Sequence, residues 1–205
     1  MTLEEKSKSV EKVLIELDGE IVQFQSWSAL GCKFGCGKCC FKPDIEATPL
    51  EFLPFAMHLH QLGKGEEWLD KIDKLADDKI CVILNPTQSG AGLCSEYQHR
   101  GLICRLFGFS ARSNKYDQKE LVTCTIIKAE QQSNYQAAEA KINSGGTVPL
   151  LSDYYLKMHY VDPVLANDFM PINKAIKRAI EIVLQYFLYR KGEVGEVEGG
   201  GLSAQ

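Results

Sequence analysis

The sequence predicts a mainly α-helical fold, a compact helical domain with a long, loop-rich segment whose cysteines bind metal. Apolar residues recur at steps of three and four in the N-terminal stretch and in the C-terminal third, which is the period of amphipathic helices. All eight cysteines lie between these two regions, within 32–124. Hydrophobic residues make up 45% of the 205, which is enough for a core.

The first predicted helix covers residues 3–27. Thr2 and Glu5 fit a capping box at its start. An apolar stripe at helical spacing should then pack over the core: Val10, Val13, Leu14, Leu17, Ile21 and Phe24.

A second helical region is predicted after the first group of cysteines. Thr48 suits the N-cap, Pro49 suits the first helical position, and Glu51 lies three residues after the cap. Gly63 should end this helix, and a short amphipathic helix should follow at 66–75.

Two histidines lie on this second predicted helix. His58 and His60 are two residues apart, so their side chains should point in different directions. We therefore expect surface or half-buried histidines rather than a pair that shares one metal ion.

The segment from 79 to 124 lacks the helical spacing of apolar residues seen before and after it. Cys81 to Leu84 reads as a short strand, closed by Asn85, Pro86 and a Gly-containing turn. No clear periodicity follows up to Cys124, and loops this long are uncommon in compact domains. We expect metal ligation to hold this segment in place.

Helices return in the C-terminal part. They are predicted at 128–143, 150–160 and 172–190, and Gly192 should end the last of them. Residues 193–205 are rich in Gly, Glu and Ser and should be disordered. The predicted organisation is a single metal-binding domain at 1–192, with a cysteine-cluster core at 30–125 and C-terminal helices at 126–191.

Charge and hydropathy limit the partners. The net charge of −4 gives no electrostatic reason to expect a nucleic acid or an anionic membrane. No apolar run approaches the ~20 residues of a membrane span, and the N-terminus lacks the apolar stretch of a secretory signal. We expect a cytoplasmic protein, in which clustered cysteines are metal ligands more often than disulfides. A disulfide framework is the weaker alternative.

The cysteines form a dense group and four single positions. Eight thiols make two complete sets of four, and four thiolates hold either one zinc ion or one cubane iron–sulfur cluster. Two centres would use every cysteine, whereas one would leave four spare. Cys39 and Cys40 are adjacent, so their side chains diverge and should serve different metals or different irons. The spacing leaves the choice between zinc and iron open.

Several motifs together resemble a known family. They are Cys32-x3-Cys36-Gly37-Lys38-Cys39-Cys40, Thr48-Pro49-x-Glu51, Cys94-x2-Tyr97-x2-Arg100-x3-Cys104-Arg105-x-Phe107, and Cys124. This combination, over about 30–125, resembles the YkgJ-like cysteine-cluster family, the CxxCxxCC zinc- or iron-chelating domain. The resemblance implies metal chelation by Cys32, Cys36, Cys39, Cys40, Cys81, Cys94, Cys104 and Cys124. A similar cysteine cluster occurs in flagellin lysine methylases, which suggests an iron–sulfur centre, with 4Fe–4S as the favoured type.

Three functions remain open. The first is a non-catalytic or electron-transferring metalloprotein with one or two cysteine-ligated centres, iron–sulfur or zinc. The second is an enzyme, either of the methylase type or like the radical S-adenosylmethionine enzymes, whose three-cysteine spacing Cys32-x3-Cys36-x2-Cys39 matches. The third is a zinc-stapled scaffold that binds another protein. Arg100 and Arg105, on either side of Cys104, are expected to offset thiolate charge.

Overall fold

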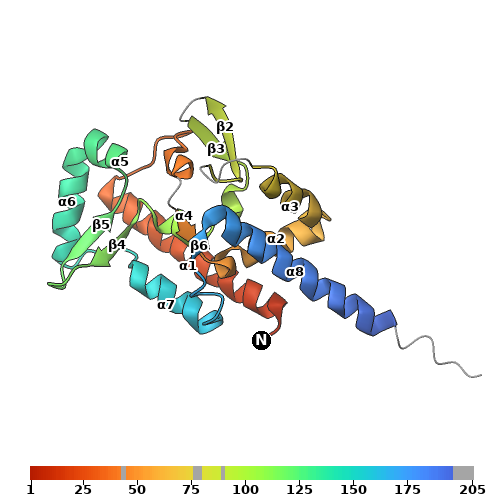
Figure 1. Cartoon of the computed structure of the whole chain (residues 1–205). Coiled ribbons are helices and arrows are strands. Elements are labelled where there is room, and N and C mark those ends of the chain that lie inside the picture. Colours follow the sequence, from red (N-terminus) through yellow and green to blue (C-terminus); the bar gives the residue numbers. More distant parts are fainter. Residues whose placement is uncertain (43–44, 76–79, 89–90, 196–205) are drawn as a thin grey trace, which may run out of the picture.

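Two long helices, α1 (Leu3–Ser28) and α8 (Ile172–Gly195), run along the molecule, and α2 (Leu53–Gln61) packs against both of them (Figure 1). The computed structural model describes residues 1–42, 45–75, 80–88 and 91–195. Eight α-helices and six short strands form within these ranges, which confirms the mainly α-helical class.

The remaining elements follow the chain in this order: η1 (Lys38–Phe41), β1 (Glu46–Ala47), η2 (Pro49–Phe52), α3 (Gly65–Asp73), β2 (Leu84–Gln88), β3 (Ala91–Cys94), η3 (Tyr97–His99), α4 (Leu102–Leu106), β4 (Ser110–Ser113), β5 (Lys119–Val122), α5 (Thr125–Glu130), α6 (Gln132–Asn143), α7 (Leu151–Val161) and β6 (Met170–Pro171). The strands pair as three antiparallel two-stranded sheets, β1–β6, β2–β3 and β4–β5.

The capping box predicted for α1 is present. Thr2 N donates to Glu5 Oε2 at 2.8 Å, and Glu5 N donates to Thr2 Oγ1 at 3.2 Å. The predicted stripe faces the core, with Val10, Leu17 and Phe24 at most 1% exposed. The helix therefore begins and faces inward as its sequence predicts.

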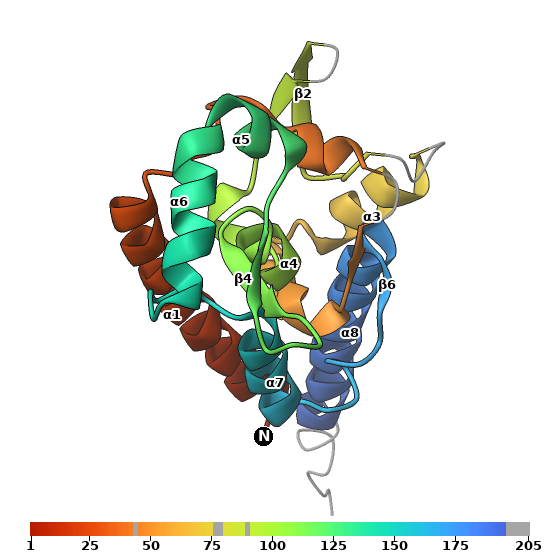
Figure 2. The same ribbon diagram turned by 90° about the vertical axis from the view of Figure 1, so that its left-hand side faces the viewer.

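The core has two parts. The main part lies between α1, α2, α7, α8 and the segment before β2. The second part joins the end of α1 to the β4–β5 hairpin, α5 and α6, and its members are Phe24, Leu30, Ala111, Leu121, Ile127, Ala138 and Ile142. Both views place the β2–β3 hairpin at the opposite end of the molecule from α7 (Figures 1 and 2).

The predicted strand at Cys81 to Leu84 was wrong. The chain turns at Cys81 to Ile83, and β2 begins only at Leu84. The reason lies on α8, where Asn173 Oδ1 accepts from Val82 N and Asn173 Nδ2 donates to Ile80 O, both at 2.9 Å. Because the Asn173 side chain satisfies these backbone N–H and C=O groups, the segment does not need a neighbouring strand to do so.

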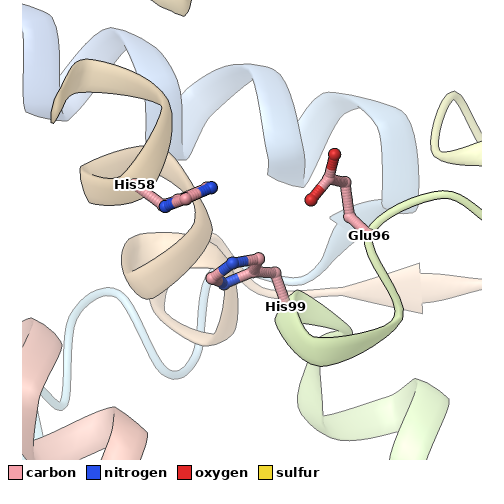
Figure 3. Close-up of side chains that lie close together, drawn as sticks. All are labelled: His58, Glu96 and His99. Carbon is pink, nitrogen blue, oxygen red and sulfur yellow. The ribbon is translucent and has the colours of Figure 1, made fainter. Parts of the chain in front are cut away.

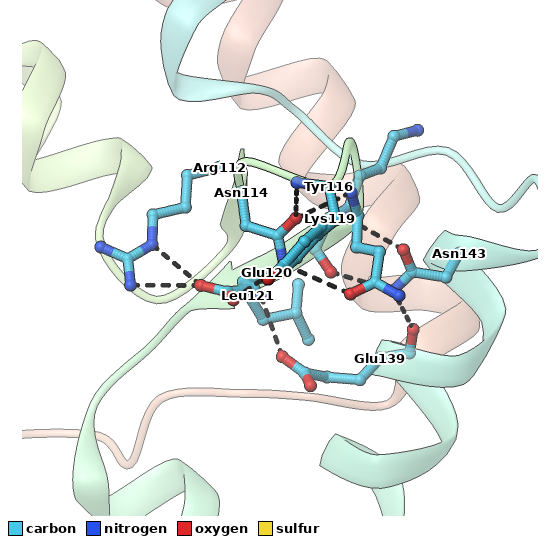
Figure 4. Close-up of polar contacts among 9 residues, drawn as sticks. Arg112, Asn114, Tyr116, Lys119, Glu120, Leu121, Glu139 and Asn143 are labelled. Carbon is cyan, nitrogen blue, oxygen red and sulfur yellow. Dashed lines mark hydrogen bonds and ion pairs between the residues drawn. The ribbon is translucent and has the colours of Figure 1, made fainter.

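The loop-rich segment predicted at 79–124 contains more regular structure than expected, because α4 and the β4–β5 hairpin lie there. Asn114 Oδ1 accepts from Tyr116 N at 2.9 Å and from Gln118 N at 3.0 Å, which shapes the turn of the hairpin. Two side chains of α6 bond to the backbone of β5 (Figure 4), Asn143 at Lys119 and Glu139 at Leu121. The edge of this small sheet is thereby covered.

The C-terminal helices follow their predictions closely, although 128–143 is divided into α5 and α6 at Gln131. Helix α8 continues through Gly195 and does not end at Gly192 as predicted. The rest of the predicted tail, 196–205, lies outside the described residues. Among the described helices, none is long and apolar enough to cross a bilayer.

Candidate metal centre

The dense cysteine group follows the end of α1 and is shaped by glycines. Gly35 and Gly37 have φ of +72° and +56°, a region that L side chains adopt only at a cost. Gly92 N donates to Gly35 O at 3.1 Å, and a Cβ on Gly37 would lie 2.8 Å from Gly92 O. The β2–β3 hairpin can therefore dock against this turn only because residue 37 is glycine.

The other four cysteines come from four separate segments. Cys81 N donates to Cys40 O at 2.9 Å, which ties the segment before β2 to η1. Cys94 ends β3, Cys104 lies within α4, and Cys124 caps α5, its Sγ accepting from Ile127 N at 3.4 Å. All eight cysteines are free thiols.

Their burial and mutual electrostatics divide the cysteines into two sets. Cys81 belongs to the main core, and Cys40, Cys94 and Cys104 pack against it; these four are the inner set. The outer set comprises Cys32, Cys36, Cys39 and Cys124. Burial first, and then the charges of Cys36, Cys39 and Cys124, raise the pKa of Cys32.

The inner thiols influence one another in the same way. Burial, and then the charge of Cys81, raises the pKa of Cys104 well above its ordinary value. Burial also raises the pKa of Cys81 to about 11, with a contribution from Cys94. These thiols are protonated near neutral pH in the absence of a metal ion, so metal binding has to displace their protons.

Cys39 and Cys40 connect the two sets. Their Sγ atoms lie 4.0 Å apart, so the two side chains do not diverge as the sequence predicted, because η1 turns the chain tightly here. The hydrogen bond from Cys40 lowers the pKa of Cys39 to about 6 and raises that of Cys40. The two sulfur atoms therefore share one proton, and the pair favours a single thiolate. The charge of Cys39 also raises the pKa of Cys81, Cys94 and Cys104.

Arg100 provides positive charge to both sets. Its charge lowers the pKa of Cys32, Cys39, Cys94 and Cys104. The guanidinium stands 3.7 Å from the centre of the Tyr97 ring, and Nε donates to Tyr97 O at 3.2 Å. These effects on the pKa agree in direction with the expected role of Arg100, offsetting thiolate charge.

Arg105 differs from this expectation. It is buried, forms an ion pair with Asp18 of α1, and donates to Gln98 O at 2.6 Å and to Arg100 O at 3.0 Å. Its guanidinium is thus engaged in holding the segment between β3 and α4 against α1. We assign it a structural role.

The distances between sulfur atoms show which side chains lie close enough to share one metal ion in this structure. No three Sγ atoms, all of which belong to described residues, lie within 4.8 Å of one another. In the described part of the chain, one group of potential ligand atoms meets that distance: His58, Glu96 and His99. Sequence reasoning missed Glu96 and His99, because no local spacing connects them with His58.

Comparison with known families agrees with metal chelation. The family model described as "CxxCxxCC: Putative zinc- or iron-chelating domain" matches residues 31–136, more than half of the 205. The chain belongs to this family. Its range begins one residue after the predicted core of 30–125 and extends further, into α6. No curated protein and no solved structure matches the chain.

The residues present fit the metals that the family description names. Cysteine thiolates are soft ligands that suit zinc and iron–sulfur clusters. The eight cysteines come from five segments, and their charges act on one another, while the charge of Arg100 acts on four of them. The chain therefore has thiols and a positive charge of the kind that metal binding uses.

Proposed function

We propose that this chain is an iron–sulfur protein that transfers electrons, with two centres held by the outer and the inner sets of cysteines. The outer set is Cys32, Cys36, Cys39 and Cys124, and the inner set is Cys40, Cys81, Cys94 and Cys104. This assignment uses every thiol once. It also assigns the adjacent Cys39 and Cys40 to different centres.

The observation that carries the choice of cluster over zinc is the spacing of the sulfur atoms. Zn–S bonds of ~2.3 Å at tetrahedral angles put any two thiolates of one zinc ion about 3.8 Å apart. Of the thiols, only the Cys39–Cys40 pair, at 4.0 Å, forms a sulfur–sulfur hydrogen-bond contact among the described residues. In a cubane each thiolate binds a separate iron, so the sulfur atoms stand further apart.

The position of the two sets supports electron transfer. Cys32 and Cys39 are exposed, whereas the inner set lies against the main core. Iron–sulfur clusters supply one-electron chemistry when they are bound. An outer centre near the surface is accessible to a partner protein, and an inner centre is shielded from water. Free thiols also agree with the reducing cytoplasm that we expect for this protein.

The radical S-adenosylmethionine alternative is less well supported. Such enzymes leave one iron of the cluster open, whereas here the charge of Cys124 acts on Cys32 and offers a fourth thiolate to the triplet. The three described sheets also contain only antiparallel strand pairs, whereas a β/α barrel is built from parallel strands. No described feature identifies a methyl-group acceptor site for a methylase.

A zinc-stapled scaffold is the second candidate, favoured by the 4.0 Å separation of Cys39 and Cys40. Iron and acid-labile sulfide distinguish the two, since a zinc protein contains neither.

Two matched serine variants test the division into sets. Cys36→Ser changes the outer set and Cys94→Ser the inner set, and both residues are half-buried. We expect each variant to lose about half of the iron of the wild-type protein while keeping its helical circular dichroism. Loss of all iron in both folded variants would indicate one shared centre. Unchanged iron in either would remove that cysteine from the ligand set.

A further inference from the structure

A second group of potential metal ligands lies beside the cysteines. His58 projects from α2, His99 ends η3, and Glu96 comes from the turn before η3 (Figure 3). One ligand atom from each lies within 4.8 Å of the other two, and all three residues are half-buried. The three side chains thus converge from two segments that are far apart in the sequence.

These side chains have no other polar engagement in the part of the chain that is described. The hydrogen bonds and ion pairs of the described residues involve neither the ring nitrogens of His58 and His99 nor the Glu96 carboxylate. The other two histidines are occupied. His60 lies flat on Phe187, at 4.1 Å between ring centres, and His159 Nδ1 contacts Asn167 Nδ2 at 3.1 Å.

The scaffold around the group is held firmly. The His58 and His99 rings stack at 4.4 Å, and Phe55, which is 1% exposed, lies 5.8 Å from His99. His99 N donates to Glu96 O at 2.9 Å, and the buried Arg105 binds the carbonyl oxygens of the segment that carries them. Sites supported in this way are well ordered before a ligand arrives.

The chemistry of this group differs from that of the thiols. Two imidazoles and one carboxylate form a nitrogen and oxygen donor set, which suits zinc and ferrous iron and leaves coordination positions open for water. The two imidazole rings would have to rotate out of their stack to bring their nitrogen atoms and the carboxylate to the ~2.0–2.2 Å bond lengths of such a site.

We propose that His58, His99 and Glu96 bind one divalent transition-metal ion, separate from the cysteine centres. The site is independent of the proposed electron transfer, because it uses no thiol. Glu96 lies two residues after Cys94, so the ion would sit next to the inner cysteine set.

Cobalt(II) is a suitable probe, because cobalt bound to thiolates gives intense charge-transfer absorption and cobalt bound to nitrogen and oxygen does not. The full chain, purified without air with its own metals in place, is titrated with cobalt. We expect one further equivalent to bind, with weak visible bands and no thiolate charge transfer. His58→Ala and His99→Ala should each lose this equivalent. His60→Ala, on the same helix, should keep it.

Zinc-edge X-ray absorption on the wild-type chain, loaded with one added equivalent of zinc, needs no variant. Nitrogen and oxygen neighbours at ~2.0–2.2 Å would support the site, and sulfur at ~2.3 Å would overturn it. Binding of no further cobalt, or equal binding by the His99→Ala variant, would also overturn it. These results leave the iron and sulfide content unchanged, so they are distinguishable from failure of the cysteine centres.

Discussion

Glu51 Oε2 accepts a hydrogen bond from Ile103 N at 2.9 Å, which joins η2 to the short helix that carries Cys104. The other oxygen of the carboxyl, Oε1, accepts from Thr48 N at 2.8 Å. Burial raises the pKa of Glu51 to about 7. One buried side chain therefore caps η2 and also fixes the position of an inner-set cysteine.

The first prediction concerns this carboxyl. In Glu51→Gln, an amide NH₂ replaces one of two oxygens that accept backbone N–H groups, so two donors face each other. An unsatisfied buried group costs about 1–3 kcal/mol, and we expect the free energy of unfolding to fall by about that amount. Urea denaturation measures it. The exposed Glu46→Gln is the control, and equal stability of the two variants would contradict the role of Glu51.

The second prediction concerns the turn at the outer cysteines. Gly35→Ala introduces only the cost of a positive φ, about 1–2 kcal/mol, because no atom lies within 4 Å of the new Cβ. Gly37→Ala adds a contact of 2.8 Å with Gly92 O. We expect Gly37→Ala to lose more metal and more stability than Gly35→Ala. Equal metal content in the two variants would show that the hairpin does not need to dock on this turn.

The third prediction concerns charge near the centres. Arg100→Gln removes the positive charge that favours thiolates of both sets. The added negative charge of a reduced cluster is then less well stabilised, so we expect a lower reduction potential. Potentiometric titration measures the shift. Arg112→Gln, an exposed arginine paired with Glu120, should have no effect, and an unchanged potential in Arg100→Gln would contradict the assignment.

The fourth prediction concerns acid stability. Burial raises the pKa of Asp162, but bonds from Lys6 Nζ at 2.7 Å and from the N–H groups of Leu165 and Val164 outweigh it, and the net pKa is lowered. The Asp162 carboxylate therefore binds its proton more tightly in the unfolded chain than in the folded protein. The resulting stability is present above the unfolded pKa of ~3.9 and is lost as pH falls through the folded pKa.

Asp162→Asn should therefore unfold more easily than the wild-type protein at pH 7, by about 1.5–3 kcal/mol for hydrogen bonds to a charged group. The difference should shrink on acidification below the unfolded pKa. Thermal unfolding at several pH values measures it, with the exposed Asp168→Asn as control. A difference that stays constant from pH 7 to acid would contradict this linkage.

The helical part of the fold was predictable because its signals are local. The Thr2–Glu5 cap and the Pro171–Ile172 start of α8 each involve residues that are close in the sequence. The stripe on α1 is likewise a repeat of three and four residues. The path of residues 80–122 was not predictable, since side chains of distant helices bond to part of its backbone. Asn173 binds the backbone on both sides of Cys81, and Asn143 binds Lys119. Neither contact can be recognised from the spacing of residues that are close in the sequence.

The cysteines were recognisable as candidate ligands from their number and grouping, but the division into sets that we propose was not. That division depends on which thiols lie against the main core and on the position of Cys124 at the start of α5. The His58–His99 pair was missed for the same reason. Their sequence separation is large, and only the packing of η3 against α2 brings the rings together.

The content of iron and acid-labile sulfide in protein purified without air, together with its visible spectrum, tests the central proposal most directly. The account predicts brown protein with iron and sulfide in equal amounts, and enough of both for two clusters per chain. Colourless protein with stoichiometric zinc and no sulfide would contradict it and would favour the zinc-stapled scaffold.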